Sequence, residues 1–183
     1  MLPWANPALL TRLIGSLASS PIQHLTIIPF HMGRYRKVPL VRCFEPITNS
    51  LRSLELRFLR TCVQALTFLI SMFPHLDDIF LERVNPIHMT WAHGGHDFEH
   101  TPSFAGIFEY LDFDASTRLA FLRWITGFPL RFHTISPDML TKDDIIVFRR
   151  LLVMCAPTLR EIPHVMFDAG ARRTFLSDSG ANR

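Results

Sequence analysis

The feature of this chain that most constrains its fold is a recurring unit: an amphipathic helix, a proline and a short apolar alternation. Four segments place apolar residues at helical spacing, which gives each predicted helix one apolar face. They begin at Leu10, Leu66, Phe121 and Ile145, and the last is interrupted at Arg149. A proline ends each helix, because it lacks the backbone donor and disfavours helical geometry in the preceding residue. These prolines are Pro21, Pro74, Pro129 and Pro157.

Short segments with apolar residues at alternate positions predict the strands, since alternation is the pattern of a half-buried strand. Six such segments begin at residues 22, 51, 76, 108, 130 and 159, with steps of 29, 25, 32, 22 and 29 residues. Strands joined by helices are expected to be parallel, with right-handed crossovers. This period, with one strand and one helix in each unit, predicts an α/β solenoid of about six βα units.

Two of the strand segments, Leu51–Leu56 (LRSLEL) and Leu76–Leu81 (LDDIFL), resemble the strand portion of leucine-rich repeats. The variable period is similar to that of the irregular repeats in fungal F-box/leucine-rich-repeat proteins. The resemblance covers residues 7–166, although the asparagine or cysteine of regular repeats is not evident after either motif. It implies a leucine-rich-repeat-like solenoid with a parallel sheet, and a role in substrate recognition for a ubiquitin ligase. We find no F-box segment in the sequence, so no contact with a ligase adaptor is carried over.

We expect a single solenoid domain over residues 1–168 and a disordered tail over residues 169–183, where polar and small residues predominate. The alternative fold is a compact α/β sandwich with helices on both faces of the sheet. Such folds usually carry a glycine-rich phosphate loop, and none of the GxGxxG or GxxxxGK type occurs among the eight glycines. A truncated repeat-protein fragment without a function of its own is a further alternative.

Composition and charge argue against several function classes. The net charge of +3 is too small to predict nucleic acid or an anionic membrane as partner. The longest apolar stretch, Val63–Phe73, is far shorter than the roughly 20 residues of a membrane span, and we find no secretory signal. Cys43, Cys62 and Cys155 are odd in number and widely spaced, which argues against disulfides and a zinc ribbon. We therefore expect an intracellular protein, cytoplasmic or nuclear.

Two segments without clear periodicity separate the units. Residues 29–49 carry the cluster Arg34-Tyr35-Arg36-Lys37, which we interpret as a solvated basic loop rather than a nucleic-acid contact. Residues 85–103 hold four of the nine histidines, His88, His93, His96 and His100. Imidazole groups at short spacing can hold zinc, so a metal-binding protein or metal-dependent hydrolase is an alternative function. Because their spacing matches no metalloprotease or zinc-finger motif, we expect no metal and no cofactor.

One face of the predicted sheet carries acidic and aromatic residues. Alternate strand positions point away from the core and form a continuous surface. Acidic residues predominate among them, and three aromatics fall on adjacent strands, a combination typical of protein-binding surfaces. The predicted partner-binding residues are Glu55, Arg57, Asp78, Phe80, Glu82, Tyr110, Asp112, Asp114 and Phe132.

These observations predict a non-enzymatic protein–protein interaction module. We find no nucleophile elbow and no set of catalytic residues. The acidic face predicts a partner protein with a basic segment, because complementary charges favour association. By resemblance, that partner is expected among the substrates of a ubiquitin ligase.

Overall fold

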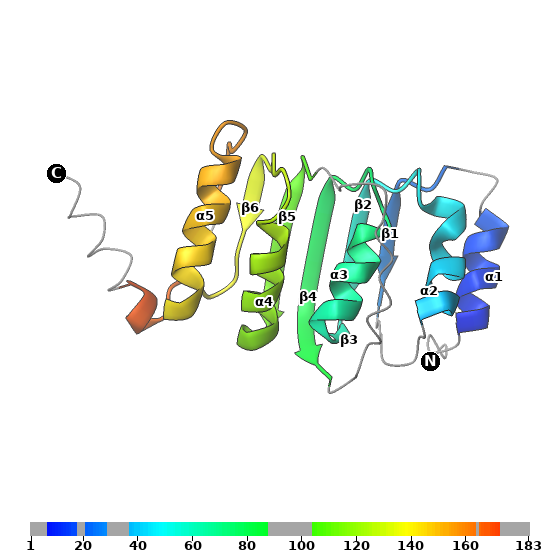
Figure 1. The fold of residues 1–183 in the computed structure, drawn as a ribbon, viewed down its shortest axis with the longest axis horizontal. Coiled ribbons are helices and arrows are strands. Elements are labelled where there is room, and N and C mark those ends of the chain that lie inside the picture. The colour runs from blue at the N-terminus through cyan, green and yellow to red at the C-terminus, as the bar shows by residue number, and fades with distance from the viewer. Residues whose placement is uncertain (1–6, 18–20, 29–36, 88–103, 164, 173–183) are drawn as a thin grey trace.

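The computed structural model describes residues 7–17, 21–28, 37–87, 104–163 and 165–172, and it shows a mixed α/β fold (Figure 1). The helices are α1 (Pro7–Leu17), α2 (Lys37–Phe44), α3 (Val63–Ser71), α4 (Ala115–Ile125) and α5 (Ile145–Cys155), with two 3₁₀ helices, η2 (Glu45–Ile47) and η3 (Lys142–Asp144). The strands are β1 (His24–Ile27), β2 (Ser53–Arg57), β3 (Arg60–Thr61), β4 (Asp78–Pro86), β5 (Ile107–Phe113) and β6 (Thr134–Ser136).

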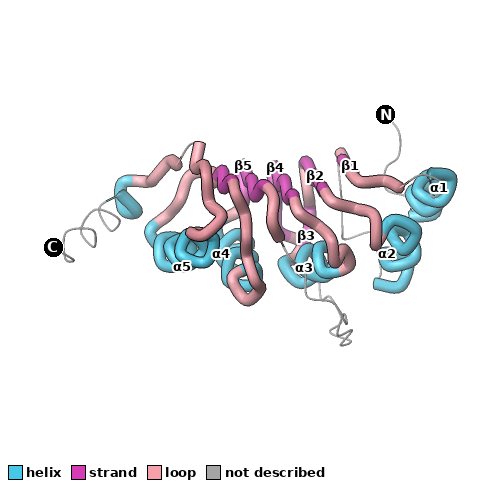
Figure 2. Tube along the Cα trace, turned by 90° about the horizontal axis from the view of Figure 1, so that it is seen from above, coloured by secondary structure: helices cyan, strands magenta, loops and turns pink. Residues whose placement is uncertain are grey.

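The six strands form one parallel sheet. Strands β1, β2, β4, β5 and β6 lie side by side in chain order, and the short β3 pairs with the end of β4. Figure 2 shows α2, α3, α4 and α5 on one side of the sheet, with α1 beside α2. The prediction of a parallel sheet with helices is therefore confirmed: α2, α3 and α4 lie between successive strands, whereas the connection from β4 to β5 includes residues 88–103, which lie outside the described residues. The described helices do not form the alternative sandwich, because none of them covers the other side.

Apolar side chains of successive strands stack in register on the helix-facing side of the sheet. One ladder joins Leu54, Ile79, Phe108 and Ile135, and a second joins Ile27, Leu56, Leu81 and Tyr110. All eight side chains are buried and belong to one hydrophobic core. The core thus lies between the sheet and its helices, as the alternation within each motif requires.

An equivalent pair of backbone hydrogen bonds recurs at three places along the sheet. The carbonyl oxygen of Gln23, one residue before β1, accepts two bonds from the amides of residues 52 and 53, both at 2.8 Å. The carbonyl of Arg52 accepts two from residues 77 and 78, at 2.7 and 2.9 Å. The carbonyl of His133 accepts two from residues 160 and 161, at 2.8 and 3.1 Å. The chain therefore repeats its local geometry as well as its sequence pattern.

The prediction of a loop over residues 29–49 is wrong for residues 37–47, which the structure describes as helical. Residues 37–44 form α2, and residues 45–47 continue as η2. This segment is ordered by burial, because Cys43, Phe44 and Ile47 lie in the core. The Phe44 ring packs edge-on against Phe73, with 5.8 Å between the ring centroids. The rest of the basic cluster, residues 34–36, lies outside the described residues.

The C-terminal boundaries also differ from the prediction. The strand expected from residue 130 begins at Thr134, and the segment from residue 159 contributes only an isolated bridge between Glu161 and Thr134. Residues 169–172, predicted to be disordered, are helical. The Asp168 carboxylate accepts a hydrogen bond from the Ala171 amide at 2.6 Å, and Ala171 is buried. This capping bond stabilises the first turn, whereas residues 173–183 lie outside the described residues.

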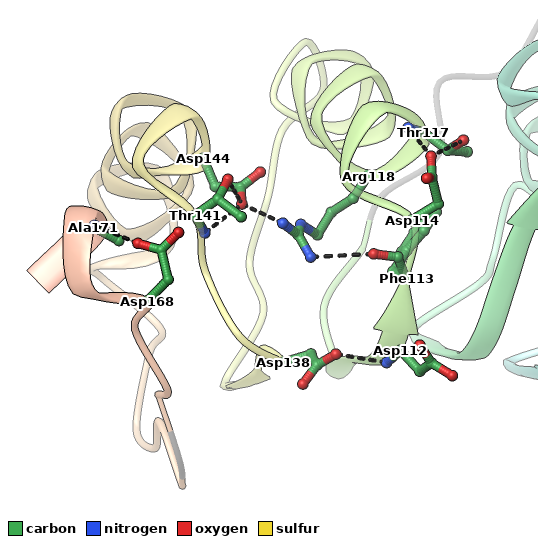
Figure 3. A network of polar contacts seen from close by, with 10 residues as sticks. All are labelled: Asp112, Phe113, Asp114, Thr117, Arg118, Asp138, Thr141, Asp144, Asp168 and Ala171. Atoms are coloured by element: carbon green, nitrogen blue, oxygen red, sulfur yellow. Dashed lines mark hydrogen bonds and ion pairs between the residues drawn. The ribbon is translucent and has the colours of Figure 1, made fainter.

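A buried ion pair connects α4 to the start of α5 (Figure 3). Arg118 on α4 donates from Nη2 to Asp144 Oδ2, and from Nη1 to the carbonyl of Phe113 at 3.2 Å. The same Asp144 oxygen accepts from the amide and the hydroxyl of Thr141, at 2.8 and 2.7 Å. Both charged residues are buried. Each charge therefore depends on the other for its compensation.

We predict that Asp144→Ala lowers the free energy of unfolding by about 3–5 kcal/mol, because it leaves the Arg118 guanidinium buried without a counter-ion. The double variant Arg118→Met/Asp144→Leu removes both charges and is expected to be more stable than the single variant. The matched control is Arg123→Met at an exposed position of α4, with an expected change below about 0.5 kcal/mol. Urea unfolding measures the free energy of unfolding of all three variants. An unchanged stability of Asp144→Ala would contradict the assignment of Asp144 as the counter-ion of Arg118.

Candidate protein-binding face

The side of the sheet opposite the helices carries two ladders of largely polar side chains, which we together call the open face. The first ladder crosses five strands through Thr26, Glu55, Phe80, Glu109 and Ser136. The second crosses three strands through Arg57, Glu82 and Leu111. Because side chains alternate along a strand, both ladders point away from the buried core.

Arg57 connects the acidic groups at the centre of the open face. Its Nε pairs with Glu55, and its Nη1 lies 3.4 Å from Glu82 Oε2. The hydroxyl of Thr26 donates to Glu55 Oε2 at 2.7 Å. Glu82 Oε1 also lies 4.0 Å from Nε of Arg83. Glu55 and Glu82 therefore each have a cationic partner within the protein.

These contacts shift the pKa of Glu55 and of Arg57. Partial burial acts to raise the pKa of Glu55, but hydrogen bonds from Thr26 and Arg57 outweigh it and lower that pKa below its usual value. The hydrogen bond to Glu55 raises the pKa of Arg57 above its usual value. Both groups are therefore charged at neutral pH.

A hollow of about 250 Å³ lies on the open face over β2, β4 and β5. Its lining residues are Glu55, Arg57, Phe80, Leu81, Glu82, Glu109 and Leu111. They bring three carboxylates against one guanidinium, together with apolar surface from Phe80 and from Leu111, which is 50% exposed. The hollow thus combines an excess of negative charge with aromatic and aliphatic contacts, an arrangement that suits a cationic group.

A row of three residues in left-handed backbone geometry runs beside the hollow. Phe58, Arg83 and Asp112 have φ values of 52°, 54° and 52°, and each directly follows a residue that lines the hollow. The guanidinium carbon of Arg83 lies 4.8 Å from the centroid of the Phe58 ring, and its Nε lies 3.8 Å from Asp112 Oδ2. Left-handed geometry costs energy in residues other than glycine. Here it turns the following side chain of each strand back into the core.

Four of the nine predicted binding residues, Glu55, Arg57, Phe80 and Glu82, meet in the hollow, and a fifth, Asp112, lies in the adjoining row. Asp78 and Asp114 instead hold the fold together. Asp78 Oδ1 accepts from the amide of Ile107 at 2.8 Å.

Asp114 caps α4, because its carboxylate accepts from the amide of Thr117 at 3.0 Å (Figure 3). Partial burial acts to raise the pKa of Asp114, but the hydrogen bonds from Thr117 and Ser116 outweigh it and lower this pKa below its usual value. Capping by Asp114 agrees with the sequence, where a carboxylate precedes the apolar stripe of this helix.

The predicted exposure of Tyr110 and Phe132 is wrong, since their exposed fractions are 1% and 0%. Phe108 pairs with Ile79, the second apolar position of its motif, and not with the first. The sequence pattern predicted burial of Leu111 and exposure of Tyr110, whereas in the observed register Tyr110 faces the helices. Phe132 lies before β6, where its ring stacks between Phe104 and Phe108 at centroid distances of 5.7 and 5.4 Å.

Sequence reasoning missed Glu109 and Leu111 for the same reason. In the observed register, Glu109 stands beside Phe80, and Leu111 stands beside Glu82. The sequence signal that could have found them is the alternation of Phe108 and Tyr110, because burial of these two side chains places Glu109 and Leu111 on the opposite side of the strand.

Other predicted sites find no further support in the described part of the chain. The histidines His88, His93, His96 and His100 lie outside the described residues. Among the described residues, no group of three or more His, Cys, Asp or Glu side chains could hold a metal ion. The three cysteines are buried and outside any disulfide. None of the described helices has both the length and the apolar character needed to cross a membrane.

Comparison with known proteins finds no relative: no protein-family model, no curated protein and no solved structure matches the chain.

We predict that Arg57→Gln raises the pKa of Glu55, because it removes both a hydrogen bond to that carboxylate and a positive charge beside it. Carboxyl ¹³C signals followed by NMR during a pH titration measure this shift. In the native protein the pKa of Glu55 is lowered by folding, so its contacts stabilise the fold above the pKa of the unfolded chain. That contribution is lost as pH falls through the folded pKa. Arg123→Gln on α4 is the control, and an equal response in both variants would contradict the assignment.

Proposed function

We propose that this chain is a non-enzymatic interaction module, a leucine-rich-repeat-like solenoid whose open face binds a basic segment of a partner protein. The observation that carries this proposal is the hollow, with its three carboxylates, one guanidinium, the half-buried ring of Phe80 and the exposed side chain of Leu111. Charge of one sign on a concave surface attracts the opposite sign. Apolar surface within a polar rim is typical of protein-binding sites.

The solenoid assignment is supported by the repetition of one geometry along the chain. Strands β1, β2, β4, β5 and β6 are neighbours in chain order, their apolar ladders are in register, and carbonyls before β1, β2 and β6 accept the same pair of amide hydrogen bonds. Stacked units with one strand and one helix are the architecture of repeat proteins.

The kind of partner follows from the charge of the hollow and from the resemblance to F-box/leucine-rich-repeat proteins. An acidic surface selects a segment rich in arginine or lysine, because complementary charges speed association and exclude acidic competitors. By the resemblance, this segment belongs to a protein that is recognised for ubiquitination inside the cell. Because such binding makes and breaks no covalent bond, the proposed module needs neither a cofactor nor catalytic residues.

We predict that a fluorescein-labelled peptide of alternating lysine and glycine binds the protein saturably in fluorescence anisotropy, and that the matching glutamate peptide does not. Glu109→Lys is expected to weaken binding about tenfold, because it replaces an attractive charge in the hollow by a repulsive one. Added salt should also weaken binding, since exposed charges are screened.

The matched control is Glu45→Lys, which makes the same charge change at an exposed position outside the hollow. It is expected to leave the affinity within about twofold of the native value, in line with the small effect of charges far from a contact. Equal losses in Glu45→Lys and Glu109→Lys would show that only net charge matters, and this result would overturn the proposal.

A further inference from the structure

The carboxylates of the hollow differ in how far they are already neutralised. Glu55 is paired with Arg57 and accepts a hydrogen bond from Thr26. Glu82 lies beside both Arg57 and Arg83. Glu109 makes no hydrogen bond or ion pair with a described residue, although it is near enough to Arg57 to contribute to that residue's raised pKa. Glu109 is therefore the carboxylate of the hollow that is available to a ligand.

The ring of Phe80 stands next to this carboxylate. Phe80 and Glu109 are direct neighbours on the adjacent strands β4 and β5, and paired positions of this kind bring side chains within contact distance. No aromatic ring and no cation among the described residues stacks on Phe80. The hollow thus offers one aromatic face and one carboxylate, side by side.

A guanidinium group fits this pair better than an ammonium group does. It is planar and weakly hydrated, stacks on aromatic rings, and can donate two parallel hydrogen bonds to one carboxylate. The ammonium of lysine is a compact, strongly hydrated charge that gains less from the ring. The chemistry of the hollow therefore favours arginine.

The neighbouring row already contains the same arrangement within the protein. The Arg83 guanidinium on β4 lies over the Phe58 ring at 4.8 Å and beside the Asp112 carboxylate on β5 at 3.8 Å, and Phe58 directly follows β2. An aromatic ring, a guanidinium and a carboxylate therefore follow one another across the sheet. In the hollow, Phe80 and Glu109 supply the ring and the carboxylate, and the guanidinium has to come from a partner.

The size of the hollow limits what can enter it. Its volume of about 250 Å³ is below the roughly 300–1,000 Å³ of pockets that enclose small-molecule ligands. The exposed Leu111 side chain lines it beside Glu82. A long basic side chain can lay its methylene groups on such apolar surface while its charged end reaches a carboxylate.

We propose that the hollow binds a single arginine side chain of the partner segment, with the guanidinium stacked on Phe80 and paired with Glu109, and with the methylene stem on Leu111. This inference rests on the proposed function and makes it specific, because it turns general attraction for basic segments into selection of arginine over lysine.

The test compares three labelled peptides in which glycine alternates with arginine, with lysine or with neutral citrulline. The native protein is expected to bind the arginine peptide about fivefold more tightly than the lysine peptide, the size of a partly exposed cation–π contact. It should bind the citrulline peptide weakest. Phe80→Leu should remove the preference by weakening the arginine peptide alone, whereas Glu109→Gln should weaken both charged peptides.

Phe58→Leu is the matched control. It also removes an aromatic ring, but one on which the guanidinium of Arg83 already stacks. It should keep the preference for arginine. Thermal unfolding shows whether each variant folds. Independently of any variant, NMR titration of the native protein with the arginine peptide should shift the amide signals of Glu109 and Leu111 more than that of Glu45.

The outcomes separate this inference from the proposed function. Equal affinity for the arginine and lysine peptides, still reduced by Glu109→Gln, overturns arginine selection and leaves the basic-segment module standing. A preference that persists in Phe80→Leu overturns the stacking on Phe80. Absence of saturable binding to either charged peptide overturns both proposals.

Discussion

The register between neighbouring parallel strands determines this structure more than any other interaction. One strand and one helix cannot bury their apolar faces alone, so each unit depends on the units beside it. The ladder through Leu54, Ile79 and Phe108 decides which side chains meet the helices. It decides equally which side chains remain outside, because a shift of β2 by one residue would exchange Leu54 with Glu55 and move this carboxylate of the hollow into the core. Fold and candidate site are thus consequences of the same pairing.

Where the apolar pattern is strong, sequence reasoning placed the strands and their outer residues correctly. The motifs beginning at Leu51 and Leu76 predicted β2 and β4, and with them four residues of the hollow. In β5 two frames were compatible with the pattern, since both bury Phe108 and Phe113. The frames differ only in the residues between these two, and the left-handed turn at Asp112 lets the observed frame return Phe113 to the core.

Other features depend on tertiary contacts that local sequence does not contain. Helix α2 has a short apolar pattern and is stabilised through packing of Phe44 against a distant phenylalanine. The helical turn after Asp168 has a polar, tail-like composition and is ordered by one capping bond. Likewise, the neutralisation of Glu55 and Glu82 but not of Glu109 follows from the reach of Arg57 across β2 and β4. Periodicity identifies the face of a sheet, whereas the ionic partners on that face require the register.

The hollow takes its walls from β2, β4 and β5, which are interior strands of the sheet. Local opening is expected to begin at β1 or β6, the two ends of the strand order, and not at the strands between them. Detachment of β1 or of β6 would remove Thr26 or Ser136 from the open face and make β2 or β5 an edge strand, whereas the lining residues on β4 would stay paired on both sides. The two end strands therefore affect the hollow unequally: loss of β1 would also remove the hydrogen bond that Thr26 donates to Glu55, whereas the residues on β4 would keep both neighbouring strands.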